Sequence, residues 1–317
     1  HTDPWDHVEC AMALTAAGLL EPARAAFDWS RRTQRPDGSW PIQLRAGVIE
    51  DANSDSNFCA YIATGVWHHI LVTGDRRFAA RMWPVVRKAI DFVIDLQGDT
   101  GEIWWARSQA GPLQEALLSG CASVFHSIRS ALALAALVDE PQPEWELALG
   151  RLGHAIAAHP EVFTEKDRYS MDWYYPILGS ALRGPEAAAR IKLRWDDFVV
   201  GGLGIRCVAD RPWVTGAETC ELVMALDAIG QRSAAHRQFG AMQHLREEDG
   251  SYWTGLVFAD GKRWPEERTT WTGAAMILAA DALSNTTAGA GIFRGEGLPM
   301  GLQTDFDCEC VATGPGR

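Results

Sequence analysis

Cysteine, basic side chains and long apolar runs are all scarce in this chain, and each shortage excludes a class of protein. The seven cysteines are scattered, with one close pair at Cys308 and Cys310, so neither a disulfide framework nor a zinc site is expected. The 29 Lys and Arg are outnumbered by 41 Asp and Glu, which argues against a nucleic-acid partner because phosphate binding needs clustered basic groups. No run of about eighteen residues is apolar and free of charge, which argues against a membrane span.

The remaining composition describes a globular chain without special chemistry. The odd number of cysteines favours reduced, mostly buried thiols, and with them a cytoplasmic location. We expect no metal ion and no cofactor, and the sequence leaves the oligomeric state open. With 47% hydrophobic residues, 317 residues can build one large core, so a single domain is predicted.

One segment type recurs six times at intervals of roughly fifty residues. In each repeat a polar or acidic opening leads into an apolar, Ala-rich stretch of helical character. The openings lie at 5–7, 55–57, 119–121, 170–172, 216–218 and 270–272. Amphipathic stretches, with apolar residues at three- and four-residue steps, lie between them at 21–34, 76–97, 144–158, 185–199 and 231–245.

Six buried helices that alternate with surface helices predict an all-α fold, an (α/α)6 toroid. Helices too apolar to face water must lie inside a ring of amphipathic ones. We expect the toroid to span residues 1–285, with an irregular tail at 286–317, and all six inner helices to begin at the same end of the ring. The chain starts on an inner helix without an initiator Met, so an outer helix is expected upstream.

Tryptophan is abundant, with fourteen residues, and many of them lie just before the inner helices or in their first turns. Sugar rings present C–H faces to aromatic planes and hydroxyl groups to carboxylates, so this mixture predicts a small-molecule carbohydrate pocket. Any single carboxylate is equally well explained as a helix cap. The predicted substrate-binding residues are Trp5, Asp6, Asp55, Trp104, Trp105, Asp172, Trp173 and Trp271. The deepest pocket is expected to join Asp6, Trp105, Asp172, Trp173, Glu218 and Trp271.

Several segments resemble bacterial glucoamylase-type glycoside hydrolases, which are six-hairpin toroids. The resemblance rests on 21–29 and 33–40 and on the later segments at 73–78, 83–84 and 89–92. The 101–107 segment is similar to the loop in which that family places its catalytic acid, and 264–271 is similar to its Phe-Pro-Gln segment. Asp6 falls where the family grips the sugar at the cleavage site. The resemblance implies hydrolysis of a glucose-containing glycoside by paired carboxylates.

The expected pair of catalytic carboxylates is absent from its family positions. Trp105 stands where the family has its acid, and the loop that should carry the base reads Ser-Tyr-Trp-Thr at 251–254. We therefore predict replacements: Glu218, in an apolar first turn that would raise its pKa, as the acid, and Glu266 or Glu267 as the base. Asp172 is a third candidate. A structural alternative pairs Glu267 with a neighbouring arginine, Arg268 or Arg263.

Two other classes of protein remain open. The segments at 34–40, 97–101 and 243–253 resemble the Gln-Trp repeats of terpenoid cyclases and protein prenyltransferases, which share the toroid. A cyclase of this kind would use Asp55, the one acid kept from its Asp-x-Asp-Asp motif. A glycan-binding toroid without catalysis would account for the missing carboxylates directly.

Overall fold

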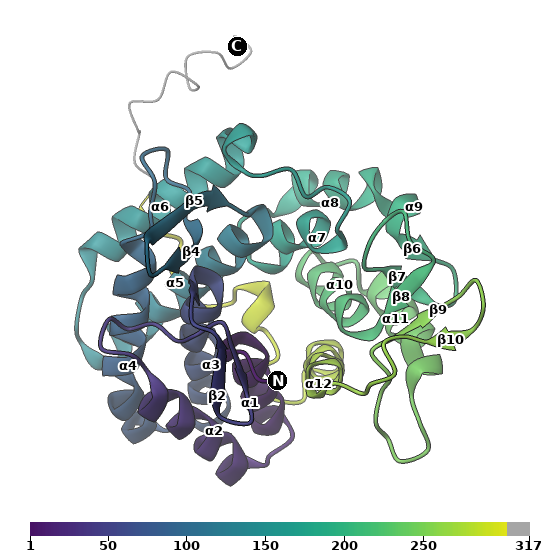
Figure 1. Ribbon diagram of the computed structural model, residues 1–317, viewed down its shortest axis with the longest axis horizontal. Coiled ribbons are helices and arrows are strands. Elements are labelled where there is room, and N and C mark those ends of the chain that lie inside the picture. The colour runs from purple at the N-terminus through teal and green to yellow at the C-terminus, as the bar shows by residue number, and fades with distance from the viewer. Residues whose placement is uncertain (303–317) are drawn as a thin grey trace.

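The computed structural model describes residues 1–302, which form a ring of helices around a closed inner layer (Figure 1). The inner helices are α1 (Pro4–Ala16), α3 (Ser56–Thr73), α5 (Leu118–Val138), α7 (Ser170–Leu178), α10 (Gly216–Ala228) and α12 (Thr270–Ser284). Each inner helix packs against the next one along the chain, and α12 packs against α1. The predicted (α/α)6 toroid is therefore confirmed, whereas Cys308 and Cys310 lie outside the described residues.

The outer helices return the chain from the end of one inner helix to the start of the next. They are α2 (Leu20–Thr33), α4 (Arg76–Ile94), α6 (Pro143–Ala158), α8 (Gly184–Leu193), the single-turn α9 (Trp195–Phe198) and α11 (Arg232–Ala241). In α4 the buried side chains include Phe78, Met82, Val86 and Ile90, one residue every turn. This spacing gives the helix one apolar face for the inner layer and one polar face for solvent.

The inner helices are buried on nearly all sides, and α5 shows this most clearly. Every residue from Cys121 to Ala135 in this helix is buried. Within the described range, α5 is the one helix whose length and composition would allow it to cross a membrane, yet 78% of the relevant window is buried inside the protein. Its apolar character therefore reflects a place in the core of the ring.

Short strands, which the sequence did not predict, lie in the loops that lead into the inner helices. A hairpin of β1 (Gln43–Arg45) and β2 (Val48–Asp51) stands alone. A second antiparallel sheet has the order β3 (Ser54–Asp55), β4 (Trp104–Ser108), β5 (Gly111–Ala116). A third has the order β10 (Lys262–Arg263), β9 (Gly255–Val257), β8 (Trp213–Thr215), β7 (Gly204–Arg206), β6 (Val199–Val200).

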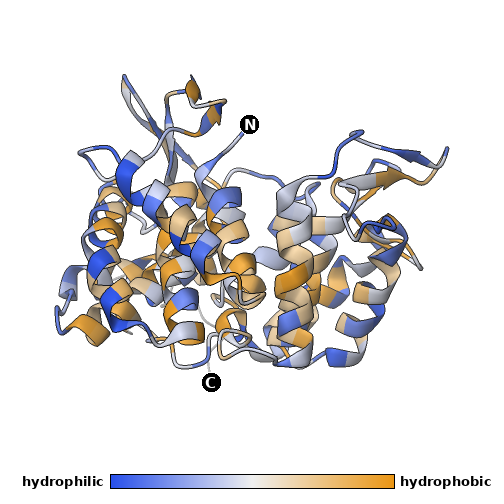
Figure 2. Ribbon diagram, turned by 90° about the horizontal axis from the view of Figure 1, so that it is seen from below, coloured by the Kyte–Doolittle hydropathy of each residue, from blue (hydrophilic) through white to orange (hydrophobic). Residues whose placement is uncertain are grey.

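These strands mark one end of the ring, which we call the mouth. Strands β3, β5 and β8 run directly into α3, α5 and α10. Backbone bridges from Thr2 to Leu44 and from Tyr169 to Val208 tie the starts of α1 and α7 to the same layer. Figure 2 shows the strands and the N-terminus together on one side of the helices. The inner helices thus begin at the mouth, as predicted.

Residues 286–302, which we call the floor segment, cross the opposite end of the ring. The segment includes a short 3₁₀ helix, η3 (Ile292–Arg294), which lies near the centre of the ring in Figure 1. Arg129 of α5 is buried and donates from Nε to the carbonyl of Pro299 at 2.7 Å. Arg183 donates to the carbonyl of Phe293 at 2.9 Å. Arg129 of the inner helix α5 and Arg183, just before the outer helix α8, therefore fix the backbone of a segment that has little regular structure of its own.

Candidate active site

Five carboxyl groups gather where α1 and α10 enter the ring. Asp3, Asp6 and Glu9 follow one another at three-residue steps along α1, and Glu218 and Glu221 have the same spacing on α10. Three-residue steps place side chains on one face of a helix, so each helix presents a short column of acids. Glu9 and Glu221 are each 1% exposed and Glu218 is 5% exposed. Burial of acids on such apolar helices is costly, which indicates a functional site.

The deepest acids are held by tyrosines from neighbouring inner helices. Tyr175 donates from its hydroxyl to Glu221 Oε1 at 2.6 Å, and Tyr174 donates to the other oxygen of the same carboxyl. Tyr61 donates to Glu9 Oε2 at 3.2 Å. Burial raises the pKa of Glu221 to about 8, against the opposing effect of the two tyrosine hydrogen bonds. Burial and the nearby charge of Glu221 also raise the pKa of Glu9 well above its usual range.

Nearer the mouth, Asp3 and Asp6 form a second pair. Asp3 caps α1 by accepting a hydrogen bond from the backbone N–H of Asp6 at 2.8 Å. Asp6 is only partly buried, so its carboxyl is the one in the cluster most open to the mouth. Burial raises the pKa of Asp6 to about 8, and the charge of Asp3 and its hydrogen bond add to this effect. Asp6 therefore keeps its proton at neutral pH.

No lysine or arginine forms an ion pair with any of these five carboxyls within residues 1–302. Protons must therefore limit the repulsion that a cation would otherwise relieve. Cys207 also faces the cluster: burial, and then the charge of Glu218 and a hydrogen bond to it, raise the pKa of the thiol. The neutral thiol is thus a hydrogen-bond donor to Glu218.

Aromatic side chains pack beside the cluster of acids. The ring of Trp5 lies 5.1 Å from that of Tyr61 and 5.6 Å from that of Trp271, measured between centroids. The Nε1 atom of Trp5 is buried and has no hydrogen-bond partner within residues 1–302. The Trp271 side chain donates toward the Glu9 carboxyl and opposes the rise in its pKa. An unpaired donor beside a group of acids provides the mixture of apolar surface and free polar groups that is typical of a ligand site.

Two hollows lie beside the cluster at the mouth. The inner hollow has a volume of about 160 Å³ and is lined in part by Asp55, Asn57, Trp105 and Ser119. The outer hollow has a volume of about 270 Å³ and lies over the starts of α5 and α7 and the end of α8. A hydrogen bond between Asp172, in the outer hollow, and Ser119 joins the two.

The predicted substrate-binding residues are divided among these three adjoining regions. Trp5, Asp6, Glu218 and Trp271 meet at the acid cluster. Asp55 and Trp105 line the inner hollow, and Asp172 and Trp173 line the outer one. Trp104, on β4, packs against the core. The expectation that six of these side chains line one pocket is therefore wrong, because the starts of α5 and α7 divide the mouth.

Glu266 and Glu267, the bases predicted from the sequence, are exposed in the loop before α12, whereas Glu9, Glu218 and Glu221 are buried. The alternative pairing of Glu267 with an arginine is not observed either. Arg268 contacts Asp249 at 3.1 Å, and Arg263 donates to the carbonyl of His244 at 2.7 Å.

Sequence reasoning missed Asp3, Glu9 and Glu221 as members of the site. Their three-residue spacing from Asp6 and Glu218 was the available signal.

Solved structures with the same architecture confirm the fold. A wild-type glycosidase is 13% identical, with a TM-score of 0.68 over 89% of this chain and 88% of that one. A D-mannose isomerase is 10% identical, with a TM-score of 0.65 over 88% of this chain and 87% of that one. None of the comparisons supports the resemblance to terpenoid cyclases. The ring has the (α/α)6 toroid architecture that these glycosidase and sugar isomerase structures share.

The closer relationship comes from sequence. Over 313 residues the chain is 76% identical to an MMP endo-(1,4)-3-O-methyl-alpha-D-mannosidase of Mycolicibacterium hassiacum, which covers 99% of this chain and 87% of the relative. The chain belongs to the family of that mannosidase. No family model matches it.

Proposed function

We propose that this protein hydrolyses internal α-(1,4) bonds in chains of 3-O-methylmannose. The observation that carries the proposal is the buried, cation-free group of five carboxyls at the mouth, because glycoside hydrolysis needs one protonated and one ionised carboxyl on opposite sides of the bond. The identity of 76% to a 3-O-methyl-mannosidase supports this choice of sugar over the glucose-containing substrate predicted from the sequence.

Asp6 is the general acid in this proposal. It holds a proton at neutral pH, since its pKa is raised to about 8, and it is the member of the cluster most open to the mouth. An acid with a pKa near the working pH donates its proton most effectively. The proton passes to the glycosidic oxygen as the bond between that oxygen and C1 breaks, and the leaving sugar departs with a free hydroxyl group.

Glu218 is the partner carboxylate. It lies close enough to Asp6 for its charge to act on that group, and the thiol of Cys207 donates to it. In this role it takes a proton from the attacking water, whose oxygen bonds to C1. A water nucleophile inverts the configuration at C1, so the freshly released product is the β-anomer.

The test uses oligosaccharides of α-(1,4)-linked 3-O-methylmannose and the Glu218→Gln and Asp6→Asn variants. Each variant keeps the shape of its side chain and removes the titratable group, so kcat should fall on the order of a hundredfold or more. Glu146→Gln, in the first turn of the outer helix α6, is the matched control and should retain activity.

Normal turnover by both cluster variants would contradict these roles. A loss of the same size in Glu267→Gln alone would show that Glu267, in the loop before α12, is the catalytic base instead of Glu218. NMR of the first product formed reports its anomeric configuration, and an α-anomer would exclude direct attack of water on the bond that is cut.

A further inference from the structure

The outer hollow has an open volume beside the acid cluster and takes no part in the chemistry proposed above. We propose that it is a subsite that binds a 3-O-methylated mannose unit of the substrate, away from the bond that is cut, and that it selects methylated over unmethylated sugar. The inference rests on the proposed function and adds to it a place where the methyl group is recognised.

The size of the hollow suits part of a saccharide chain. Its volume of about 270 Å³ is slightly below the range of about 300–1,000 Å³ that is typical of small-molecule sites. It is bounded by the loop at 160–167, the first turn of α7 and the end of α8.

Part of the lining is polar and held by hydrogen bonds. Asp172 is 7% exposed, and its carboxyl accepts hydrogen bonds from Ser119. Behind it, Arg190 donates to the carbonyls of Asp172 and Trp173 at 2.6 and 2.9 Å, which fixes the first turn of α7. Lys166 also lines the hollow. A fixed carboxyl at the base of a hollow accepts hydrogen bonds from sugar hydroxyl groups.

The lining also includes apolar side chains that are incompletely covered. Leu118, Phe163 and Leu193 line the hollow, and Leu193 is 80% exposed. A methyl ether placed there would bury apolar surface and would have no donor to leave unpaired. A free hydroxyl in the same place would lose water without gaining a partner, which penalises the unmethylated sugar.

The position of the hollow fits an enzyme that cuts within a chain. Ser119 links it to the inner hollow, and Asp55 in the inner hollow lies near enough to Asp3 for their charges to interact. The acid cluster, the inner hollow and the outer hollow therefore follow one another along the starts of α1, α3, α5 and α7. A saccharide bound across the cluster can extend along this path into the outer hollow.

Binding to the Glu218→Gln protein tests the subsite without cleavage. Titration calorimetry would compare a 3-O-methylated α-(1,4)-mannose oligosaccharide with its unmethylated counterpart. Adding Leu193→Ser, or separately Phe163→Ser, should reduce the preference for the methylated sugar on the order of tenfold, the scale of one small apolar group in a pocket. Leu193→Ser changes an exposed side chain, so it keeps the test valid if Phe163→Ser fails to fold. Leu147→Ser, an exposed leucine on the outer helix α6, is the matched control.

An unchanged preference in Leu193→Ser and in folded Phe163→Ser would overturn the subsite. Tight, methyl-dependent binding that these variants weaken, together with no cleavage by the wild-type protein, would support the subsite and refute the proposed hydrolysis. Cleavage by the wild-type protein, together with unaltered selectivity in the variants, would support the proposed hydrolysis and refute the subsite. Absence of binding by either sugar to the Glu218→Gln protein would overturn both.

Discussion

The pKa of Asp6, the proposed general acid, depends on the neighbouring carboxyl group of Asp3. Asp3 raises the pKa of Asp6 through its charge and its hydrogen bond, second only to burial. Asn at position 3 removes that charge yet still caps α1, because Asn is as good a cap as Asp. Asp3→Asn should therefore lower the pKa of Asp6, and the fall in kcat/KM at alkaline pH should begin below the wild-type limit of about 8.

A pH profile of kcat/KM for the wild-type and variant proteins is the measurement. Asp75→Asn is the control, since Asp75 caps α4 in the same way through the N–H groups of Arg77 and Phe78. It should leave the alkaline limb in place. A limb that moves to higher pH in Asp3→Asn would show that Asp3 does not act on the acid through its charge.

At the level of residues, sequence could predict that acids and tryptophans meet at the starts of the inner helices. It correctly brought Asp6 and Glu218 to the mouth. It passed over Glu9 and Glu221, because an acid one turn inside an Ala-rich helix is indistinguishable, without the ring, from one that faces water. The tyrosines that donate hydrogen bonds to Glu221 come from α7, about fifty residues away in the chain. No local sequence pattern predicts such a long-range hydrogen bond.

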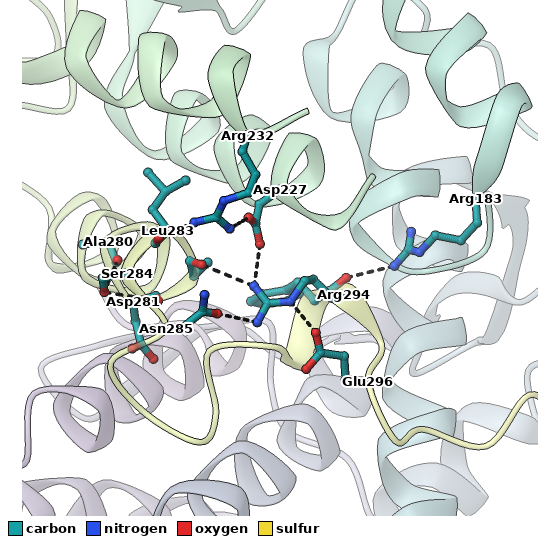
Figure 3. Close-up of polar contacts among 12 residues, drawn as sticks. Arg183, Asp227, Arg232, Ala280, Asp281, Leu283, Ser284, Asn285, Arg294 and Glu296 are labelled. Atoms are coloured by element: carbon teal, nitrogen blue, oxygen red, sulfur yellow. Dashed lines mark hydrogen bonds and ion pairs between the residues drawn. The ribbon is translucent and has the colours of Figure 1, made fainter. Parts of the chain in front are cut away.

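At the level of elements, the floor segment depends on one buried ion-pair group (Figure 3). The Asp227 side chain is 1% exposed; it accepts from Arg294 of η3 at 2.6 Å and also pairs with Arg232 of α11. Removing the buried carboxylate takes from Arg232 its carboxylate partner and leaves Arg294 with only the exposed Glu296, at 2.6 Å. Asp227→Asn should therefore lower the free energy of unfolding by about 3 kcal/mol, measured by urea denaturation.

The matched control is Asp260→Asn, which breaks an exposed contact with Lys262 at 3.1 Å. Surface pairs of this kind contribute less than about 1 kcal/mol. Hydrogen exchange at 292–294 should also accelerate in Asp227→Asn, because η3 loses its tie to α10. Equal destabilisation by the two variants would refute the anchoring role.

The helices could be predicted from the sequence, whereas the short strands and the floor segment could not. The inner and outer helices could be predicted because each face of a helix meets either the core or solvent along its whole length, which gives the sequence a regular apolar pattern. Strands β3, β6 and β10 have only two residues each, too few to show an alternating pattern, and β3 forms only by pairing with β4, about fifty residues further along the chain. The floor segment likewise takes its conformation from Arg129 and Arg183, which lie far from it in sequence.

At the scale of the whole molecule, buried acids and buried histidines make stability depend on pH in opposite directions. Burial raises the pKa values of Asp6 and Glu221 to about 8, and it lowers those of His68 and His69 to about 4 and that of His126 to about 3. In the unfolded chain the acids titrate near pH 4 and the histidines near pH 6.5. From about pH 4 to 6.5, rising pH therefore destabilises the protein through the acids and stabilises it through the histidines.

Above about pH 6.5 the contribution of the histidines fades, because they lose their protons in the unfolded chain as well, and above about pH 7.5 only the acids still act. The folded protein keeps protons on Asp6 and Glu221 that the unfolded chain has released, so the free energy of unfolding should fall as pH rises, until the acids ionise near 8. Thermal unfolding across this range should show a steady decline in Tm. Glu221→Gln should make the decline shallower, whereas the surface change Glu146→Gln should not. A Tm that rises between pH 6.5 and 8 would mean that the carboxyls of the mouth are already ionised in the folded protein, and Asp6 would then lack the proton that the proposed mechanism requires.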